Sequence, residues 1–147
     1  MVNSVSDIFS NDELVDRAFY RIAWNIRYMW EETGSSDTRL FLEPIIPHKF
    51  VLAGRSDGGT YNEHVVPRVM LCEACHNMLS VDHSDESLIT IAMFLKKYLK
   101  VVQITKDEQM RLDFDLKRKQ KMPDGWTYDT GNVFARLDAA GIHYELF

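Results

Sequence analysis

The sequence has little of what marks exported, membrane-spanning or repetitive proteins. It holds two cysteines and four prolines among 147 residues, too few cysteines for a scaffold stapled by disulfides. No apolar run approaches the roughly 20 residues that span a bilayer, and residues 1–11 lack the basic start and apolar stretch of a signal peptide. We therefore expect a cytoplasmic protein with no membrane contact and with reduced cysteines.

Common cofactor motifs are also missing. The sequence has neither G-x-x-x-x-G-K-[ST] nor G-x-G-x-x-G, so we expect no nucleotide cofactor. The stretch from Cys72 to His76 has C-x-x-C-H spacing, but haem attachment by this motif takes place in exported proteins, so we expect no haem. Cys72 and Cys75 fit the apolar face of a helix as small core residues, and a zinc site that adds His76 and His83 is the alternative.

Composition indicates one folded domain. The chain is 46% hydrophobic and 12% aromatic, which is enough to build a core, and it contains no repeat or linker that would separate a second domain. We expect a single α+β domain over residues 1–147, with a flexible N-terminus over residues 1–10. The net charge of -5 argues against a protein that coats nucleic acid through bulk positive charge.

Helices are predicted from apolar spacing and capping residues. Ser10 followed by Glu13 forms a capping-box pattern, and apolar residues then recur at helical spacing to Glu32. Thr105 and Glu108 repeat the capping-box pattern further along the chain. In all we expect about five helices, over residues 11–32, 68–79, 84–98, 105–116 and 133–140.

Short extended segments fill the remaining sequence and predict a small, mostly antiparallel sheet. We expect strands over residues 39–43, 49–53, 61–66, 100–104 and 142–146. The three tryptophans, Trp24, Trp30 and Trp126, are predicted to anchor the core. His48 and His143 are isolated in the sequence, so we expect them at the surface or its rim.

The segment Asn62–Pro67 carries the most specific chemistry. It puts Glu63 beside His64 in an apolar strand, and a metal-assisted hydrolase needs one group to hold a cation and a neighbour to take a proton from water. The alternative is a partly buried histidine that hydrogen-bonds to Glu63 or to the backbone. In a regular strand the two side chains point to opposite faces, so the hydrolase hypothesis requires the strand to end there.

This segment resembles the first half of the ββα-metal, or HNH, endonuclease motif. Residues 101–113 resemble the second half, with an apolar strand, the Thr105 cap, an acidic first turn and a helix. The resemblance departs from the family at Gln109, which stands where the family has a histidine. The segment between the two halves is also longer than usual, because two predicted helices are inserted there.

The resemblance implies a metal-dependent nuclease or phosphodiesterase, intact or catalytically degenerate, that acts on nucleic acid. Glu63, Gln109 and Asp113 would hold a divalent metal, Mg²⁺ or Zn²⁺, and His64 would be the general base. Arg68 would bind a substrate phosphate, and Arg111 is an alternative for that role.

A non-catalytic interaction protein is the second hypothesis. An acidic domain without an intact site would suit an accessory or inhibitor protein of a phage or mobile element, which inhibits a host protein or a nucleic-acid-binding complex. Its partner would then present a basic surface, although helix capping and solvation explain the same charges. The acidic residues expected to face that partner are Asp82, Asp85, Glu86, Asp107 and Glu108.

Overall fold

A long N-terminal helix precedes a small mixed sheet in this α+β domain, which is described here from a computed structural model. The structure describes residues 8–115 and 119–147, so most of the N-terminus expected to be flexible lies outside the described residues. The helices are α1 (Asn11–Thr33), α2 (Arg68–Val81), α3 (Asp85–Tyr98), α4 (Lys106–Met110) and α5 (Ala135–Ala139). The strands are β1 (Leu52–Ser56), β2 (Tyr61–His64), β3 (Val101–Ile104) and β4 (Tyr144–Leu146).

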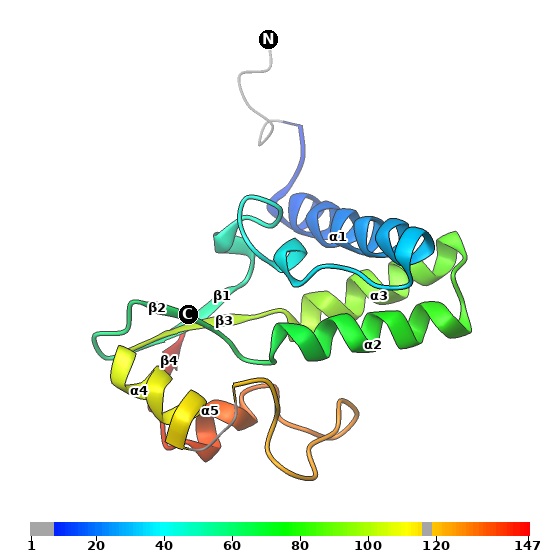
Figure 1. Cartoon of the computed structure of the whole chain (residues 1–147). Helices are drawn as coiled ribbons and strands as arrows, with labels where there is room; N and C mark the ends of the chain where they lie inside the picture. Colours follow the sequence, from blue (N-terminus) through cyan, green and yellow to red (C-terminus); the bar gives the residue numbers. More distant parts are fainter. Residues whose placement is uncertain (1–7, 116–118) are drawn as a thin grey trace.

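The four described strands form one mixed sheet in the order β2-β3-β1-β4. The β1–β3 pair is parallel, and the β2–β3 and β1–β4 pairs are antiparallel. The three long helices lie together to one side of the strands, while α4 and α5 lie below the sheet (Figure 1). The sheet is therefore covered by helices that come before β1, between β2 and β3, and between β3 and β4.

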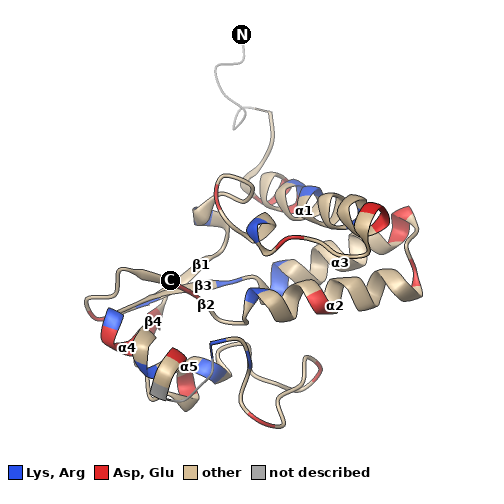
Figure 2. Cartoon of the chain, in the orientation of Figure 1, with Lys and Arg blue, Asp and Glu red and all other residues tan. Residues whose placement is uncertain are grey.

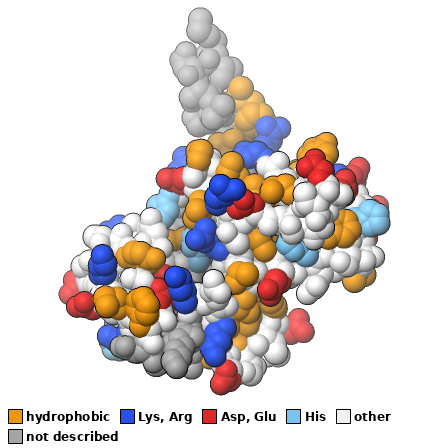
Figure 3. All heavy atoms as spheres, viewed as in Figure 1, with side chains coloured by type: hydrophobic (Ala, Val, Ile, Leu, Met, Phe, Trp, Pro, Cys, Tyr) orange, Lys and Arg blue, Asp and Glu red, His pale blue; other side chains and the backbone are white. Residues whose placement is uncertain are grey.

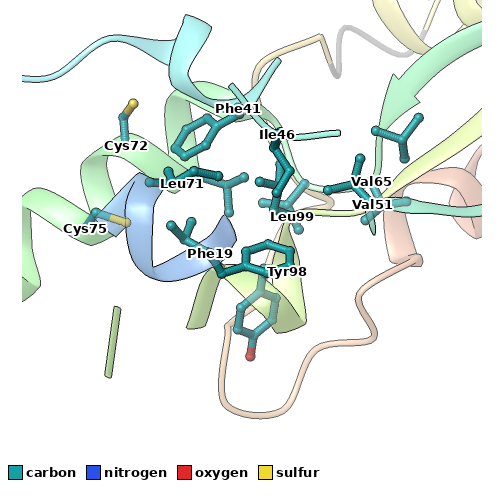
Figure 4. Packing of buried hydrophobic residues seen from close by; sticks show 14 of the residues in the cluster. Phe19, Phe41, Ile46, Val51, Val65, Leu71, Cys72, Cys75, Tyr98 and Leu99 are labelled. Atoms are coloured by element: carbon teal, nitrogen blue, oxygen red, sulfur yellow. The ribbon is translucent and has the colours of Figure 1, made fainter. Parts of the chain in front are cut away.

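The core lies where α1, α2 and α3 meet the sheet and the segment that leads into it. Phe19, from the buried face of α1, packs in the same cluster as Phe41, Leu71 and Leu99, which come from three other parts of the chain (Figure 4). Each of these side chains is at most 2% exposed. Burying a side chain of this size contributes roughly 1.5–3 kcal/mol, so this cluster holds the helical layer on the sheet.

Two of the predicted strands are wrong or displaced. Thr38–Phe41 and His48–Phe50 are 3₁₀ turns, and β1 begins only at Leu52. The first turn forms because the Asp37 carboxylate accepts a hydrogen bond from the Arg39 backbone N–H at 2.8 Å. Such a local side-chain cap offers the backbone an alternative to strand pairing.

The helix starts predicted at Ser10 and Thr105 are confirmed. Ser10 accepts a hydrogen bond from the Glu13 backbone N–H, and Thr105 and Glu108 form the reciprocal pair of a full capping box. The helix expected over residues 105–116 is shorter than predicted, because α4 passes into a π-helical turn over Arg111–Asp115; residue 116 lies outside the described residues.

Replacement of Thr105 by alanine removes the side-chain acceptor of the Glu108 N–H and is expected to lower the free energy of unfolding by about 1 kcal/mol. Thr105→Ser keeps the hydroxyl and should lie within a few tenths of a kcal/mol of wild type. Urea denaturation followed by circular dichroism measures both variants. An equal loss in the serine and alanine variants would contradict the capping role.

Candidate functional site

The strand–strand–helix order required by the resemblance is present. β2 and β3 pair antiparallel, with Glu63 opposite Val102 and His64 opposite Val101. Helix α4 follows β3 directly and packs against β2. The inserted helices α2 and α3 pack with α1 and do not interrupt the β2–β3–α4 unit (Figure 1).

Glu63 is bound by an arginine that the sequence did not single out. The Arg136 Nη2 donates a hydrogen bond to Glu63 Oε1 at 2.6 Å and a second to the His64 carbonyl oxygen. Arg136 lies on α5 and is 1% exposed, and Glu63 is 8% exposed. The sequence offers one signal for this role of Arg136, which is its position between the apolar residues Ala135 and Leu137 in a short helix. An arginine buried with such neighbours needs an anionic partner.

Several charges act on the Glu63 carboxyl. Burial raises its pKa, and the Arg136 guanidinium opposes that rise through its charge and its hydrogen bond. The charge of Asp113 raises the pKa further and that of Arg68 lowers it. The charges of Asp113 and Arg68 thus act on Glu63, while the contact at hydrogen-bond distance is made by Arg136.

The His64 imidazole lies at the end of β2 in a largely buried position. Burial and then the charge of Arg68 lower its pKa to about 4, against an opposing hydrogen bond with the Phe41 backbone. Its Nε2 is buried and has no hydrogen-bond partner among the described residues. A general base works best with a pKa near the working pH and with access to its proton, so this arrangement suits a structural histidine better than a base.

His48 is half-buried, within the surface or rim position expected for it. Its Nε2 is buried without a hydrogen-bond partner among the described residues, and the charge of a protonated His48 lowers the pKa of His64. Two imidazoles thus lie near one another beside β2.

The remaining predicted site residues make contacts of their own. The Gln109 side-chain amide donates a hydrogen bond to Asp113 Oδ2, one helical turn further on. Arg68 begins α2 and is half-buried. Arg111 donates from Nη1 to the Ala140 carbonyl oxygen at 2.7 Å, so it anchors the π-helical turn to the end of α5. On the face seen in Figure 3, Lys and Arg side chains gather beside histidine side chains near the middle of the molecule.

Arg136 competes with a divalent ion for Glu63. Metal binding at Glu63 needs its carboxylate oxygens, and one of them accepts the 2.6 Å hydrogen bond from Arg136. A cation beside Glu63 would meet the guanidinium charge at close range in a buried site, where repulsion is weakly screened. In residues 8–115 and 119–147, no group of three or more His, Cys, Asp or Glu side chains is placed to hold a metal.

Cys72 and Cys75 pack as predicted. Both thiols are buried and unpaired, and burial raises the pKa of each. His76 instead forms a hydrogen bond of 2.6 Å between its Nε2 and Ser36 Oγ, and the Ser36 hydroxyl also lies 3.7 Å from Cys72 Sγ. These contacts tie the segment after α1 to α2.

The acidic residues proposed to face a partner are largely used within the chain. Asp85 pairs with Arg27 at 2.8 Å, and Asp82 accepts a hydrogen bond from the Ser84 backbone N–H. Glu108 accepts from the Thr105 N–H at 2.8 Å and from Ser56 Oγ at 2.6 Å. At these three positions the charge is explained by capping and pairing, the alternative noted from the sequence.

A groove between α1 and α3 lies on the described surface and has a volume of about 930 Å³. Trp24, which was predicted to anchor the core, lies here instead and is 36% exposed. Met93 and Ile89 of α3 are 67% and 57% exposed along the opposite wall. We call this surface the α1–α3 groove; it is lined by Asp16, Arg17, Phe19, Tyr20, Arg21, Trp24, Asn25, Ile89, Ala92, Met93, Lys96 and Lys97.

Comparisons with known proteins add no relative. No family model matches this chain, and no match was found among curated proteins or among solved structures. The resemblance to HNH endonucleases therefore depends on the residues and the strand–strand–helix order alone. None of the helices in the described part of the chain combines the length and the apolar content needed to cross a bilayer.

The Glu63–Arg136 pair is tested by a double-mutant cycle. Arg136→Met leaves a buried carboxylate without its partner and is expected to cost about 3–5 kcal/mol of unfolding free energy. Glu63→Gln is the milder single change, and the double variant should lose at least about 1 kcal/mol less than the sum of the singles. Urea denaturation of all four proteins measures the coupling, and additive losses would show that the pair does not act as a unit.

The lowered pKa of His64 predicts a pH dependence of stability. An unfolded histidine takes up a proton near pH 6.5, while folded His64 does so at about 4, so between these values the unfolded state binds more protons and stability falls as the pH falls. From pH 7 to pH 5, wild type should lose about 2 kcal/mol more than His64→Gln. The raised pKa of Glu63 has the opposite sign but is present in both proteins. Equal losses in urea titrations at the two pH values would contradict the assignment.

Proposed function

We propose that this chain is a non-catalytic protein-interaction domain built on a core that resembles the ββα-metal unit. The observation that carries the proposal is the Arg136 guanidinium, which contacts the Glu63 carboxylate and the His64 carbonyl oxygen. In the nuclease family, the residue at the position of Glu63 holds a metal ion. Here an arginine side chain provides the positive charge at that position.

The contacts around this pair support a structural role for the predicted catalytic residues. His64 carries a pKa of about 4 and a buried Nε2, and Gln109 is hydrogen-bonded to Asp113. The Arg136 contacts join β2 to α5, two elements far apart in the sequence. In this ion pair the positive charge of the Arg136 side chain takes the place of a coordinated metal ion. The fold then holds its core without a bound ion.

The interaction role is supported by the α1–α3 groove. Large apolar side chains such as Trp24 and Met93 are exposed there together, and exposed apolar patches in soluble proteins commonly mark binding surfaces. Tryptophan in particular is enriched among the residues that dominate binding energy. An accessory or inhibitor protein that binds a host protein, as expected from the sequence, would use such a surface.

A metal-dependent nuclease is the second candidate. The observation that favours it is the β2–β3–α4 order, which brings the charge of Asp113 close enough to act on Glu63. Activity of this kind would require Arg136 to leave Glu63, so that the carboxylate becomes available. The two candidate functions therefore differ in what binds the Glu63 carboxylate, which is Arg136 in the first and a metal ion in the second.

Calorimetry with Mg²⁺, Mn²⁺ and Zn²⁺, beside cleavage assays on plasmid DNA and total RNA, tests the choice. We expect no saturable ion binding and no turnover above that of the matched His64→Ala and Glu63→Gln variants. In parallel, wild type and Met93→Ser serve as baits in native extract, and we expect a partner that the variant loses.

Metal-dependent cleavage that disappears in His64→Ala would reject the non-catalytic proposal and favour the nuclease. Retention of the same partner by wild type and Met93→Ser would reject the groove as the interaction surface.

A further inference from the structure

The α1–α3 groove has a chemical character that indicates its occupant. Its walls are two helices packed side by side, and its floor includes the buried Phe19 and the half-buried Ala92. Trp24 makes an edge-on contact with Tyr28, with ring centroids 4.2 Å apart. A long apolar channel between two helices is the shape that accepts the apolar face of a third helix.

The rim of the groove is positive although the chain as a whole is negative. Among the described residues that line it, four are basic and one, Asp16, is acidic, while the net charge of the chain is -5. Asp16 pairs with Lys96 at 2.8 Å, so it neutralises one of the four. The local surplus is therefore opposite in sign to the rest of the molecule.

Two of the basic groups are placed to meet a ligand. The Arg17 guanidinium lies 4.1 Å from the centre of the Phe9 ring, and Lys97 Nζ lies 5.1 Å from that of Tyr98. Both side chains are exposed, and within the described part of the chain neither forms an ion pair with a carboxylate. Arg21 instead donates to the Ile45 carbonyl oxygen at 2.6 Å, which fixes the rim beside the groove.

The charges are also distributed along the groove. α3 begins with two acidic residues and ends with Lys96 and Lys97, and acidic and basic positions occur along both helices in Figure 2. α1 runs antiparallel to α3, so its acidic first turn, Asp12 and Glu13, lies at the same end as these lysines. The basic surplus is therefore confined to the residues that line the groove. A ligand of matching chemistry has an apolar face flanked by carboxylates.

We propose that the α1–α3 groove binds an acidic amphipathic helix of a partner protein. Its apolar face would contact Trp24, Ile89 and Met93, and its glutamates or aspartates would pair with Arg17 and Lys97. This inference depends on the proposed interaction function and reverses the partner charge expected from the sequence, which was basic. Single-stranded nucleic acid would also meet aromatic and basic groups here, but the aliphatic wall of Ile89 and Met93 offers no stacking surface for bases.

Binding of two designed helical peptides tests the proposal. Each is about 18 residues long, or about 27 Å, and both share one leucine-rich face, flanked by glutamate in the first and by lysine in the second. Fluorescence anisotropy should show the glutamate peptide binding at least about tenfold more tightly than the lysine peptide at about 0.1 M salt, with the difference shrinking toward about 1 M salt.

Matched variants locate the binding. Met93→Ser should weaken the glutamate peptide about tenfold, and Met110→Ser on α4, where the methionine is 48% exposed, should leave it unchanged. Lys97→Glu should reduce the preference for glutamate over lysine, and Lys106→Glu on α4 should not. Thermal melting of the four variants separates loss of binding from loss of folding.

Several results would overturn the inference. These are failure of the glutamate peptide to bind, equal binding of the lysine peptide, and equal effects of Met93→Ser and Met110→Ser. Self-association in sedimentation that Met93→Ser abolishes would assign the groove to a second copy of the chain. Tighter binding of a poly-dT or poly-U oligonucleotide, lost in Lys97→Glu, would assign it to nucleic acid. None of these results depends on the cleavage assay. If the peptide experiments fail, the non-catalytic proposal is still tested separately by the metal-binding and cleavage measurements.

Discussion

The buried pair between Glu63 and Arg136 is the interaction on which the arrangement of this protein depends. It connects β2, at one edge of the sheet, to α5, which leads into β4 at the other edge. Removing either partner leaves a buried charge or an unpaired acceptor, and both are costly in a low-dielectric interior. The same guanidinium bonds to the His64 carbonyl oxygen, so one side chain fixes the strand end where the sequence predicted catalysis.

This pair also decides how the resemblance to HNH endonucleases is interpreted. β2, β3 and α4 follow one another in the order strand, strand and helix, and the charges of Asp113 and Arg68 act on Glu63. On the non-catalytic proposal, a side chain of α5 supplies the positive charge beside Glu63 that a bound ion would supply in the family. Such a site would lack the Lewis acid that this hydrolysis uses.

Much of the fold was predictable from the sequence, because α1 has a regular apolar stripe with a capping residue before it and Gly34 after it. The failures have local causes. Trp24 was assigned to the core because of its size, but it lies about 200° around the helix from the buried Ile22 and Ile26. Thr38–Phe41 forms a 3₁₀ turn because the Asp37 carboxylate caps it, and the spacing of apolar residues does not reveal such a contact.

The candidate site was predicted only in part, for a different reason. Adjacent residues such as Glu63 and His64 can be found in a sequence, and the capping box at Thr105 locates the second half of the motif. Arg136 is distant in sequence, and its role follows from tertiary packing alone. The α1–α3 groove is likewise formed by two helices that β1, β2 and α2 separate in the sequence, and the net charge of -5 does not reveal its positive rim.

The most direct test of the central claim is a crystal structure of the protein soaked in Mn²⁺, with anomalous data collected to locate the ion. We expect the Arg136 guanidinium to remain in contact with Glu63 and the His64 carbonyl oxygen, with no anomalous peak beside them. A manganese peak bonded to Glu63, with Arg136 displaced, would contradict the account and restore the metal-dependent nuclease.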